Sequence, residues 1–377
     1  MERTEWGRPT RAVIDLEAVR TNVRNTKEWI GPETELIAVV KADGYGHGAV
    51  RVAEAALQAG ASMLAVATPE EAVDLREAGL EAEILLLGAA PLPFLEVAAA
   101  HNITVTADSA RWVRDAAARP EKWPNPLKVH LKLDTGMSRI GMRTGEELLG
   151  AWGTAREAGM IVEGVFTHFA KADDEDSGLQ RRQEARFREL LGALPEKPRL
   201  VHASNSAATY LHPDTRFDAV RLGISMYGIP ASEHVGRNMP IPLKPALSLE
   251  SRLVHVKKIS RGDTVSYGGT YEAADDEWIG TIPIGYADGL LRGLGGQEVL
   301  VGGRRVPIVG RICMDQCMVR LPGETEPGEP VVLIGRQGDE EITAAEWAAR
   351  LGTIPYEVVV TLSKRIQRVY PKQDWEG

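Results

Sequence analysis

Lys41 is the residue of this chain whose type and position most directly indicate covalent chemistry. It follows the apolar stretch at residues 35–40, and a glycine-rich turn that contains Tyr45 comes directly after it. A lysine at a strand end often does no more than extend its charged head into solvent. A desolvated lysine, however, has a lowered pKa, and its neutral amine can attack an aldehyde. Lys41 is therefore a candidate nucleophile.

Polar groups also follow four later apolar stretches. Backbone amides of a glycine-containing loop after a late barrel strand commonly bind phosphate. Two such loops, around residues 204–206 and 221–224, predict a phosphorylated cofactor or substrate. The polar residues in question are Lys132 and Arg139 near stretch 127–133, His168 after 161–167, Ser206 after 200–203, and Arg221, Gly223 and Ile224 near 218–222.

The elements that must position these residues are short apolar runs that alternate with amphipathic stretches. This alternation predicts an α/β fold, an N-terminal (β/α)8 TIM barrel, whose catalytic groups would follow the C-terminal ends of its strands. A doubly wound parallel sheet is the alternative. The predicted strands are 35–40, 63–67, 84–87, 103–106, 127–133, 161–167, 200–203 and 218–222, and the predicted helices include 49–59, 70–78, 110–118, 146–157 and 180–194.

The sequence pattern of the chain changes after the proline-rich segment 240–245. Short, valine-rich runs separated by glycine turns predict a mostly β C-terminal domain, which sets the expected domains at 11–241 and 242–377. Residues 344–351 read as a helix with Thr343 as N-cap and Gly352 as its stop. Residues 355–366 could also be helical, and residues 1–10 could add a strand to either domain. The predicted strands here are 253–259, 277–283, 298–301, 304–309, 318–321 and 330–334.

Composition narrows the classes of function. The 377 residues are 44% apolar, which favours a packed core over disorder, and the net charge of −9 argues against a nucleic-acid surface. No signal segment or membrane-length apolar run is present, so we expect a cytoplasmic protein with no membrane partner. Cys313 and Cys317 lack the companion ligands of a zinc site, and we expect no metal.

The segment Val-Val-Lys-Ala-Asp-Gly-Tyr-Gly-His-Gly at 39–48 resembles the cofactor-lysine signature of the alanine racemase family, which are fold-type III pyridoxal phosphate enzymes. The resemblance implies an N-terminal barrel, a C-terminal β domain, a head-to-tail homodimer and pyridoxal 5′-phosphate as cofactor. Further matching segments follow in the same order along the chain, at 131–141, 164–170, 202–207, 220–228, 265–271, 283–289, 310–316 and 355–358.

The resemblance also implies a role for individual residues. Lys41 would carry the cofactor, and Lys41 and Tyr267 would be the two catalytic bases. Arg221 would face the pyridine nitrogen, and His168 would link Arg221 to Tyr267. Tyr267, Met314 and Asp315 would enter from the partner subunit. The remaining assignments are Tyr45, Ser206, Gly223, Ile224 and Tyr356 to the phosphate, Arg139 to the substrate carboxylate, Tyr286 to the substrate entrance, and Lys132 as a carbamylated lysine.

The implied reaction is the interconversion of L-alanine and D-alanine, which supplies D-alanine for peptidoglycan. Racemisation needs acid/base groups on opposite faces of the α-carbon, and the pair Lys41 and Tyr267 meets that need. The alternatives are a racemase for serine or for several amino acids, a related decarboxylase, and a non-catalytic pyridoxal phosphate-binding protein. The decarboxylases would be expected to carry an acid at the Arg221 position, and the binding proteins lack the second domain.

Overall fold

The computed structural model describes residues 7–119 and 123–371. The chain divides into two compact units. Among the described residues, the barrel unit comprises 17–44, 49–119 and 123–244, and the sheet unit comprises 7–16, 45–48 and 245–371. Each unit is described by itself below.

The barrel unit is a closed ring of eight parallel strands, and the last strand pairs with the first. This confirms the predicted TIM barrel and all eight predicted strands, and the doubly wound alternative is wrong. The strands are short and almost fully buried, as expected of a parallel sheet covered on its outer face. They are β2 (Glu35–Val39), β3 (Met63–Val66), β4 (Glu83–Ala89), β5 (Ile103–Ala107), β6 (Lys128–Lys132), β7 (Ile161–Phe166), β8 (Leu200–His202) and β9 (Ala219–Leu222).

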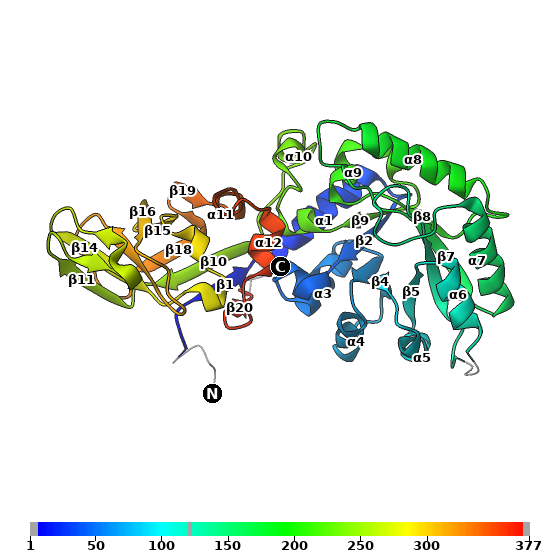
Figure 1. Ribbon diagram of the computed structural model, residues 1–377, viewed down its shortest axis with the longest axis horizontal. Helices are drawn as coiled ribbons and strands as arrows, with labels where there is room; N and C mark the ends of the chain where they lie inside the picture. Colours follow the sequence, from blue (N-terminus) through cyan, green and yellow to red (C-terminus); the bar gives the residue numbers. More distant parts are fainter. Residues whose placement is uncertain (1–6, 120–122, 372–377) are drawn as a thin grey trace, which may run out of the picture. The chain divides into compact units, whose positions relative to one another are not determined.

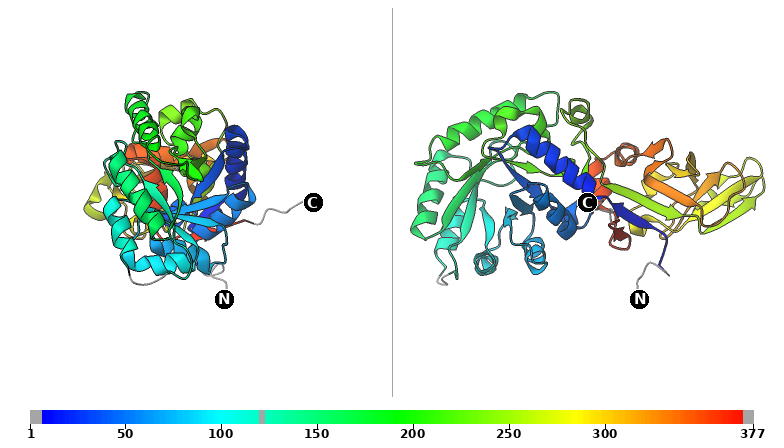
Figure 2. Two further views of the ribbon diagram at one scale, coloured as in Figure 1. Left: turned by 90° about the vertical axis from the view of Figure 1, so that its right-hand side faces the viewer. Right: turned by 180° about the vertical axis from the view of Figure 1, so that it is seen from behind.

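Helices cover the outside of the ring (Figures 1 and 2). The five predicted helices are confirmed, and Thr68 and Thr144 begin α4 and α7 with capping boxes. The first helix, α1, was missed because polar Asn22 and Thr26 lie on its buried face and obscure the apolar pattern. The helices of this unit are α1 (Leu16–Ile30), α3 (Ala49–Gln58), α4 (Pro69–Glu77), α5 (Leu95–Ala100), α6 (Ala110–Ala117), α7 (Gly145–Glu157), α8 (Gly178–Leu191), α9 (Ser206–Leu211) and α10 (Glu233–Arg237).

The sheet unit is built on a ten-stranded sheet in the order β11-β14-β17-β16-β15-β18-β10-β1-β20, with β19 paired to β18. All six strands predicted for the C-terminal domain are present. Its strands are β1 (Arg11–Ile14), β10 (Leu247–Arg252), β11 (His255–Ile259), β14 (Glu277–Ile282), β15 (Glu298–Val301), β16 (Arg304–Val309), β17 (Cys317–Leu321), β18 (Pro330–Gln337), β19 (Glu340–Ile342) and β20 (Gln367–Val369), with a separate pair β12 (Thr264–Val265) and β13 (Tyr271–Glu272).

Strand β1 decides where the N-terminal segment belongs. It pairs antiparallel with β10 and parallel with β20, so residues 11–14 belong to the sheet unit and not to the barrel, which differs from the expected barrel start at residue 11. Ala12 and Ile14 are buried while Arg11 faces solvent and pairs with Glu250 opposite it. Four alternating residues are too short a pattern to assign to one domain from sequence.

Two helices lie near the end of the chain. Helix α11 (Ala344–Leu351) matches its prediction, with Thr343 as N-cap and Gly352 in the left-handed region at φ 67°. The prediction of helix over 355–366 is wrong in length, because α12 (Pro355–Val360) stops at Thr361. The residues after it turn so that 367–369 can pair with β1, and this long-range pairing overrides the local apolar pattern. Within the described residues, no helix has the length and apolar character to cross a bilayer.

Candidate active site

A left-handed turn directly follows Lys41. Ala42, Asp43, Gly44 and Tyr45 all have φ between 50° and 60°, and the Gly44 amide donates to the Val40 carbonyl at 2.8 Å. Each non-glycine residue in this region costs about 1–2 kcal/mol. Strain of this kind concentrates at functional sites, where the surrounding structure holds it in place. The glycines seen in the sequence therefore mark a strained turn that starts at the lysine.

Glu71 holds this turn in place. Its carboxylate accepts the amide of Ala42 at 2.6 Å and the amide of Ala67 at 2.8 Å, which ties the start of the turn to the end of β3. Asp43 contributes from the other side, because its Oδ1 accepts the Ala49 amide at 3.0 Å at the start of α3. The backbone that carries Lys41 is thus fixed on both sides.

The Lys41 amine lies in an electropositive, half-buried position. Burial lowers its pKa below the usual value for lysine, and the charges of Arg139 and Arg221 lower it further, while Glu71 opposes them. A lower pKa leaves more of the amine in the neutral, nucleophilic form at neutral pH. The structure therefore gives Lys41 the property that attack on an aldehyde requires.

Arg221, on β9, is a buried guanidinium, with a residue exposure of 3%. Its Nη1 donates to His202 Nδ1 at 2.6 Å, and its Nη2 lies 3.1 Å from His168 Nδ1. Nη2 also donates to the carbonyls of Thr167 and Ala203. Burial and the nearby Arg139 lower the pKa of Arg221 to about 9, so the group remains a cation at neutral pH.

His168 follows β7 and accepts a hydrogen bond from Arg221. Because a guanidinium can only donate, Nδ1 of His168 must be the acceptor and Nε2 must carry the proton. Burial and the charge of Arg221 hold the pKa of His168 well below its usual value, so the ring is neutral. A neutral ring with a protonated Nε2 can pass the polarising effect of Arg221 to an acceptor on its far side.

Lys132 ends β6 and is buried beside the same arginines. Its ammonium donates to the Leu133 carbonyl at 2.6 Å. Burial lowers the pKa of Lys132 to about 7, and Arg221 and Arg139 add to that effect. Arg139 itself is exposed on the loop after β6. A lysine in this environment is partly neutral at neutral pH, which is the form that reacts with carbon dioxide.

The loops after β8 and β9 are joined by a hydrogen bond. The Gly223 amide donates to the Ser206 hydroxyl at 2.9 Å, and Ile224 begins the short 3-10 turn that follows. In the described part of the chain, none of the four basic side chains Lys41, Lys132, Arg139 and Arg221 forms an ion pair with a carboxylate. Amides, a hydroxyl and unpaired cations at one mouth of a barrel form a donor set that fits a phosphorylated cofactor together with a carboxylate substrate.

The sheet unit carries the other predicted site residues, beginning with two tyrosines. The rings of Tyr45 and Tyr356 lie 6.2 Å apart between centroids, at an interplanar angle of 52°. Tyr45 is buried and belongs to the left-handed turn, whereas Tyr356 lies at the start of α12. Two of the five residues that the family resemblance assigns to the phosphate are thus neighbours within this unit.

Tyr267 stands on a strained turn and is 72% exposed. The preceding residue, Ser266, has φ 67°, which is unfavourable for a residue with a side chain. Its hydroxyl donates to the Arg311 carbonyl at 2.6 Å and so holds this conformation. The strain and the hydrogen bond together fix the direction in which Tyr267 leaves the backbone.

The loops that carry Tyr286 and Met314 are hydrogen-bonded to each other. The Tyr286 amide donates to the Cys313 carbonyl at 3.0 Å, and the Ala287 amide donates to the Met314 carbonyl at 3.0 Å. A Cβ at Gly285 would lie 2.3 Å from the Cys313 carbonyl oxygen, so only glycine permits this approach.

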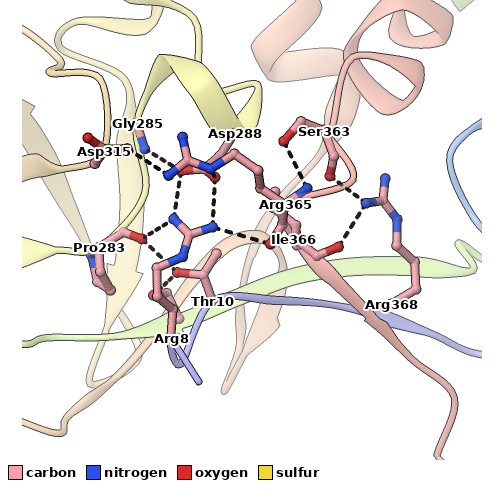
Figure 3. A network of polar contacts seen from close by, with 11 residues as sticks. Arg8, Thr10, Pro283, Gly285, Asp288, Asp315, Ser363, Arg365, Ile366 and Arg368 are labelled. Carbon is pink, nitrogen blue, oxygen red and sulfur yellow. Dashed lines mark hydrogen bonds and ion pairs between the residues drawn. The ribbon is translucent and has the colours of Figure 1, made fainter. Parts of the chain in front are cut away.

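Asp315 is held by Arg365, whose Nη2 donates to its Oδ1 at 2.6 Å (Figure 3). Arg365 also lies 3.5 Å from the buried carboxylate of Asp288, in the turn that follows Tyr286. The loop with Met314 and Asp315 and the loop with Tyr286 are therefore connected through side chains as well as through their backbones.

The structure thus brings the predicted residues together in two groups. The sequence assigned no role to Glu71, His202 or Ser266, although His202 ends a barrel strand and Glu71 follows a Thr-x-x-Glu capping pattern. Cys317 is buried, which raises the pKa of its thiol, and no cluster of potential metal ligands occurs among the described residues. Lys41, Lys132, Arg139, His168, Ser206, Arg221, Gly223 and Ile224 lie in the barrel unit, and Tyr45, Tyr267, Tyr286, Met314, Asp315 and Tyr356 lie in the sheet unit.

Comparison with known proteins covers both units. The family model of the alanine racemase N-terminal domain matches residues 14–231, and that of the alanine racemase C-terminal domain matches residues 246–370. The chain belongs to the alanine racemase family. Its members are pyridoxal phosphate-dependent isomerases, so the cofactor expected from the sequence is confirmed. The donor set at the barrel mouth fits that cofactor.

Individual relatives agree with this assignment. The chain is 49% identical to alanine racemase 1 of Bacillus subtilis (strain 168) over 98% of its own length and 95% of that protein. It is 49% identical to the alanine racemase of Geobacillus stearothermophilus over 97% and 94% of the two chains. Among solved structures, the alanine racemase from E. faecalis matches with a TM-score of 0.94 at 45% identity, covering 97% of this chain and 99% of that one. A histidine racemase from Leuconostoc mesenteroides matches with a TM-score of 0.91 at 32% identity, covering 97% and 98%.

Proposed function

We propose that this protein interconverts L-alanine and D-alanine with pyridoxal phosphate held on Lys41. The observation that carries the proposal is the half-buried Lys41 amine, which begins a strained left-handed turn at a barrel mouth with basic side chains and has a lowered pKa. Relatives at 45–49% identity are alanine racemases, whereas the histidine racemase is 32% identical. When bound, the cofactor withdraws electrons from the substrate's α-carbon and so makes its proton removable.

Lys41 and Tyr267 are the two bases of this proposal. The Lys41 amine would move a proton at one face of the α-carbon, and the Tyr267 hydroxyl would move one at the opposite face. His168 supports the tyrosine, because its protonated Nε2 can donate to a phenolate while Nδ1 stays bonded to Arg221.

The remaining residues bind and orient the reacting molecules. The amides of Gly223 and Ile224 and the hydroxyls of Ser206, Tyr45 and Tyr356 hold the phosphate. Arg221 donates to the pyridine nitrogen, and Arg139 binds the substrate carboxylate, with a carbamylated Lys132 as its counter-charge. In this proposal the barrel unit supplies Lys41, Arg221 and the loops around Ser206 and Gly223, and the sheet unit supplies Tyr45, Tyr356 and Tyr267.

We further propose that the active unit is a homodimer. Tyr267 is 72% exposed and Met314 52% exposed in the single chain, and Tyr286 is also exposed, although all three are large side chains with apolar surface. They stand on successive loops of one unit, and a second copy that covers them would place them beside its own barrel mouth. The free thiols of Cys313 and Cys317 support a reducing, cytoplasmic location, where D-alanine for peptidoglycan would be made.

The test is to incubate the purified protein with added pyridoxal phosphate and to measure racemisation of alanine, serine and histidine by chiral chromatography. Alanine should give the highest kcat/KM, and faster turnover of serine or histidine would overturn the alanine assignment. Lys41→Arg should lower activity by more than about 10³-fold and abolish the absorbance of the lysine-bound cofactor. Lys257→Arg, at an exposed position of β11, is the matched control and should change neither.

A further inference from the structure

A line of buried polar groups leads from Arg221 through the interior of the barrel, on the side away from the proposed chemistry. Arg221 Nη1 lies 2.6 Å from His202 Nδ1, and His202 Nε2 lies 2.9 Å from His130 Nδ1. His130 Nε2 in turn lies 3.6 Å from Glu163 Oε2, which is longer than a hydrogen bond, and this nitrogen has no hydrogen-bond partner among the described residues. These four residues come from strands β9, β8, β6 and β7, so the line crosses the barrel core.

The protonation state of each ring follows from the guanidinium at one end. Arg221 can only donate, so His202 Nδ1 must accept and His202 Nε2 must carry the proton. His202 then donates to His130 Nδ1, which leaves the proton of His130 on Nε2, facing the Glu163 carboxylate. One cation thereby determines both tautomers.

Both histidine rings are neutral, so the only charged groups of the line are Arg221 at one end and Glu163 at the other. His130 and His202 are fully buried, and burial lowers the pKa of each; Arg221 lowers that of His202 further. Every N–H along the line points from the cation toward the carboxylate, so the ring dipoles are aligned and strengthen one another. Removal of Arg221 would leave both tautomers undetermined, whereas removal of Glu163 would leave the N–H at His130 Nε2 without the carboxylate that faces it.

The surroundings of Glu163 keep its side chain in the anionic form. It is 7% exposed and accepts the Thr104 hydroxyl at 3.2 Å, with Arg199 at 3.4 Å and Lys128 at 3.8 Å. Burial alone would raise its pKa, but the nearby His130, Arg199 and Lys128 outweigh burial and lower the pKa of Glu163 below its usual value. Glu163 is the first carboxylate reached from Arg221 along the line.

The barrel wall is shaped to admit the His130 ring. A Cβ at Gly164 would lie 2.7–2.8 Å from three atoms of that ring, so any larger residue would displace it. Two residues further along β7, the Phe166 ring stacks on His202 with centroids 4.8 Å apart and planes at 8°. The positions of both imidazoles are thus fixed by packing as well as by hydrogen bonds.

We propose that Glu163 and His130 are positioning residues for racemisation, which act through His202 to hold the Arg221 guanidinium in one orientation and to balance its buried charge. The proposal rests on the proposed function, in which Arg221 faces the cofactor. Neither residue touches substrate or cofactor. Their effect is on the direction and strength of the hydrogen bond that Arg221 can offer.

The first test reads the tautomers without any substrate. Solid-state ¹⁵N NMR of the histidine-labelled apoenzyme should show His130 and His202 as neutral rings protonated on Nε2 from pH 6 to 9, with signals assigned through His130→Gln and His202→Gln. A His202 ring protonated on Nδ1, or an imidazolium at either position, would overturn the proposed line. This result does not depend on whether the protein racemises alanine.

The second test compares two carboxylates of the same charged cluster. Glu83 pairs with Lys128 and Arg199 as Glu163 does, but its charge acts on His130 only from a distance, whereas Glu163 lies 3.6 Å from the ring. Glu163→Gln should lower kcat for alanine about tenfold, the size of one weakened charge-assisted hydrogen bond, with KM changed less than about twofold. Glu163→Asp should recover part of the loss, and Glu83→Gln should have no effect. Equal kinetics for Glu163→Gln and Glu83→Gln in an active enzyme would refute the positioning role, whereas a wild type inactive on every amino acid would refute the proposed function.

A third variant keeps every polar group and moves only the ring. Gly164→Ala should displace His130, shift the His202 ¹⁵N signals and lower kcat as Glu163→Gln does. Gly150→Ala is the control, because a Cβ there meets no atom within 4 Å. If Glu163→Gln fails to fold, Gly164→Ala and the wild-type spectra still test the positioning role. Unchanged His202 signals together with an unchanged kcat in folded Gly164→Ala would count against the proposal.

Discussion

The Asp288 carboxylate accepts both terminal nitrogens of Arg8, at 2.9 Å from Nη1 to Oδ2 and 2.8 Å from Nη2 to Oδ1, although 280 residues separate the two in sequence. Asp288 is fully buried and also accepts the Gly285 amide at 3.1 Å, so it closes the turn that carries Tyr286 (Figure 3). The ion pair thus joins the N-terminal segment to one of the loops proposed to line the substrate entrance.

Loss of this carboxylate should destabilise the sheet unit. Asp288→Asn keeps the size of the side chain but removes the negative charge and one of the two acceptor oxygens that face Arg8 and Arg365, so we expect the free energy of unfolding to fall by roughly 3 kcal/mol, as when a buried ion pair loses one partner. Urea unfolding followed by circular dichroism would measure the change. Asp276→Asn breaks the exposed pair with Lys258 and should leave the urea midpoint unchanged. Similar midpoints for both variants would contradict the structural role of Asp288.

The proposed dimer predicts complementation between two inactive variants. If the Tyr267 of one copy serves the Lys41 of the other, mixed dimers of Lys41→Ala and Tyr267→Phe contain one intact site of two. Random re-pairing of equal amounts should therefore restore about a quarter of the wild-type activity. A mixture of Lys41→Ala with Lys41→Arg should remain inactive. Absence of recovery, with subunit exchange verified by mass spectrometry under native conditions, would show that each site is built from one chain.

Lys132 should form a carbamate in a pH-dependent manner. With its pKa lowered to about 7, the amine is mostly neutral at pH 8 and can attack carbon dioxide, forming an N–C bond and releasing a proton. Incubation with ¹³C-bicarbonate at pH 8 should give a carbamate ¹³C signal, which is lost as the pH falls below about 6 because the amine is then protonated. Lys132→Arg should lack the signal and raise KM for alanine about tenfold through Arg139. A signal of equal strength in Lys132→Arg would place the carbamate on another lysine.

Arg221 should control which reaction follows removal of the α-proton. If Arg221 faces the pyridine nitrogen as proposed, a cation that can only donate would leave that nitrogen unprotonated and the cofactor a weaker electron sink. Arg221→Glu should slow racemisation by at least about tenfold and raise the proportion of transamination, measured as pyruvate formed per alanine racemised. The same partitioning between the two products in variant and wild type would defeat this explanation.

Local patterns were sufficient for much of the fold. The barrel strands are near-continuous apolar runs bounded by turns, and buried parallel strands must have that character. Helix α11 was predicted to the residue because Thr343 and Gly352 cap it chemically. Helix α1 was not predicted, because Asn22 on its buried face donates to the carbonyls of Met226 and Lys244. These partners lie about 200 residues away, so no local pattern contains them.

The sequence by itself determined the barrel, the β-rich second half and the family, because buried strands, caps and the segment around Lys41 leave local signatures. Only the tertiary structure decided that Arg11–Ile14 pairs with the C-terminal sheet, that Lys41 starts a left-handed turn held by Glu71, and that Glu163 reaches Arg221 through two histidines. The physical reason is the same in each case. Strand pairing, desolvation and hydrogen-bond direction depend on which distant groups meet in space, and residue order alone does not contain that information.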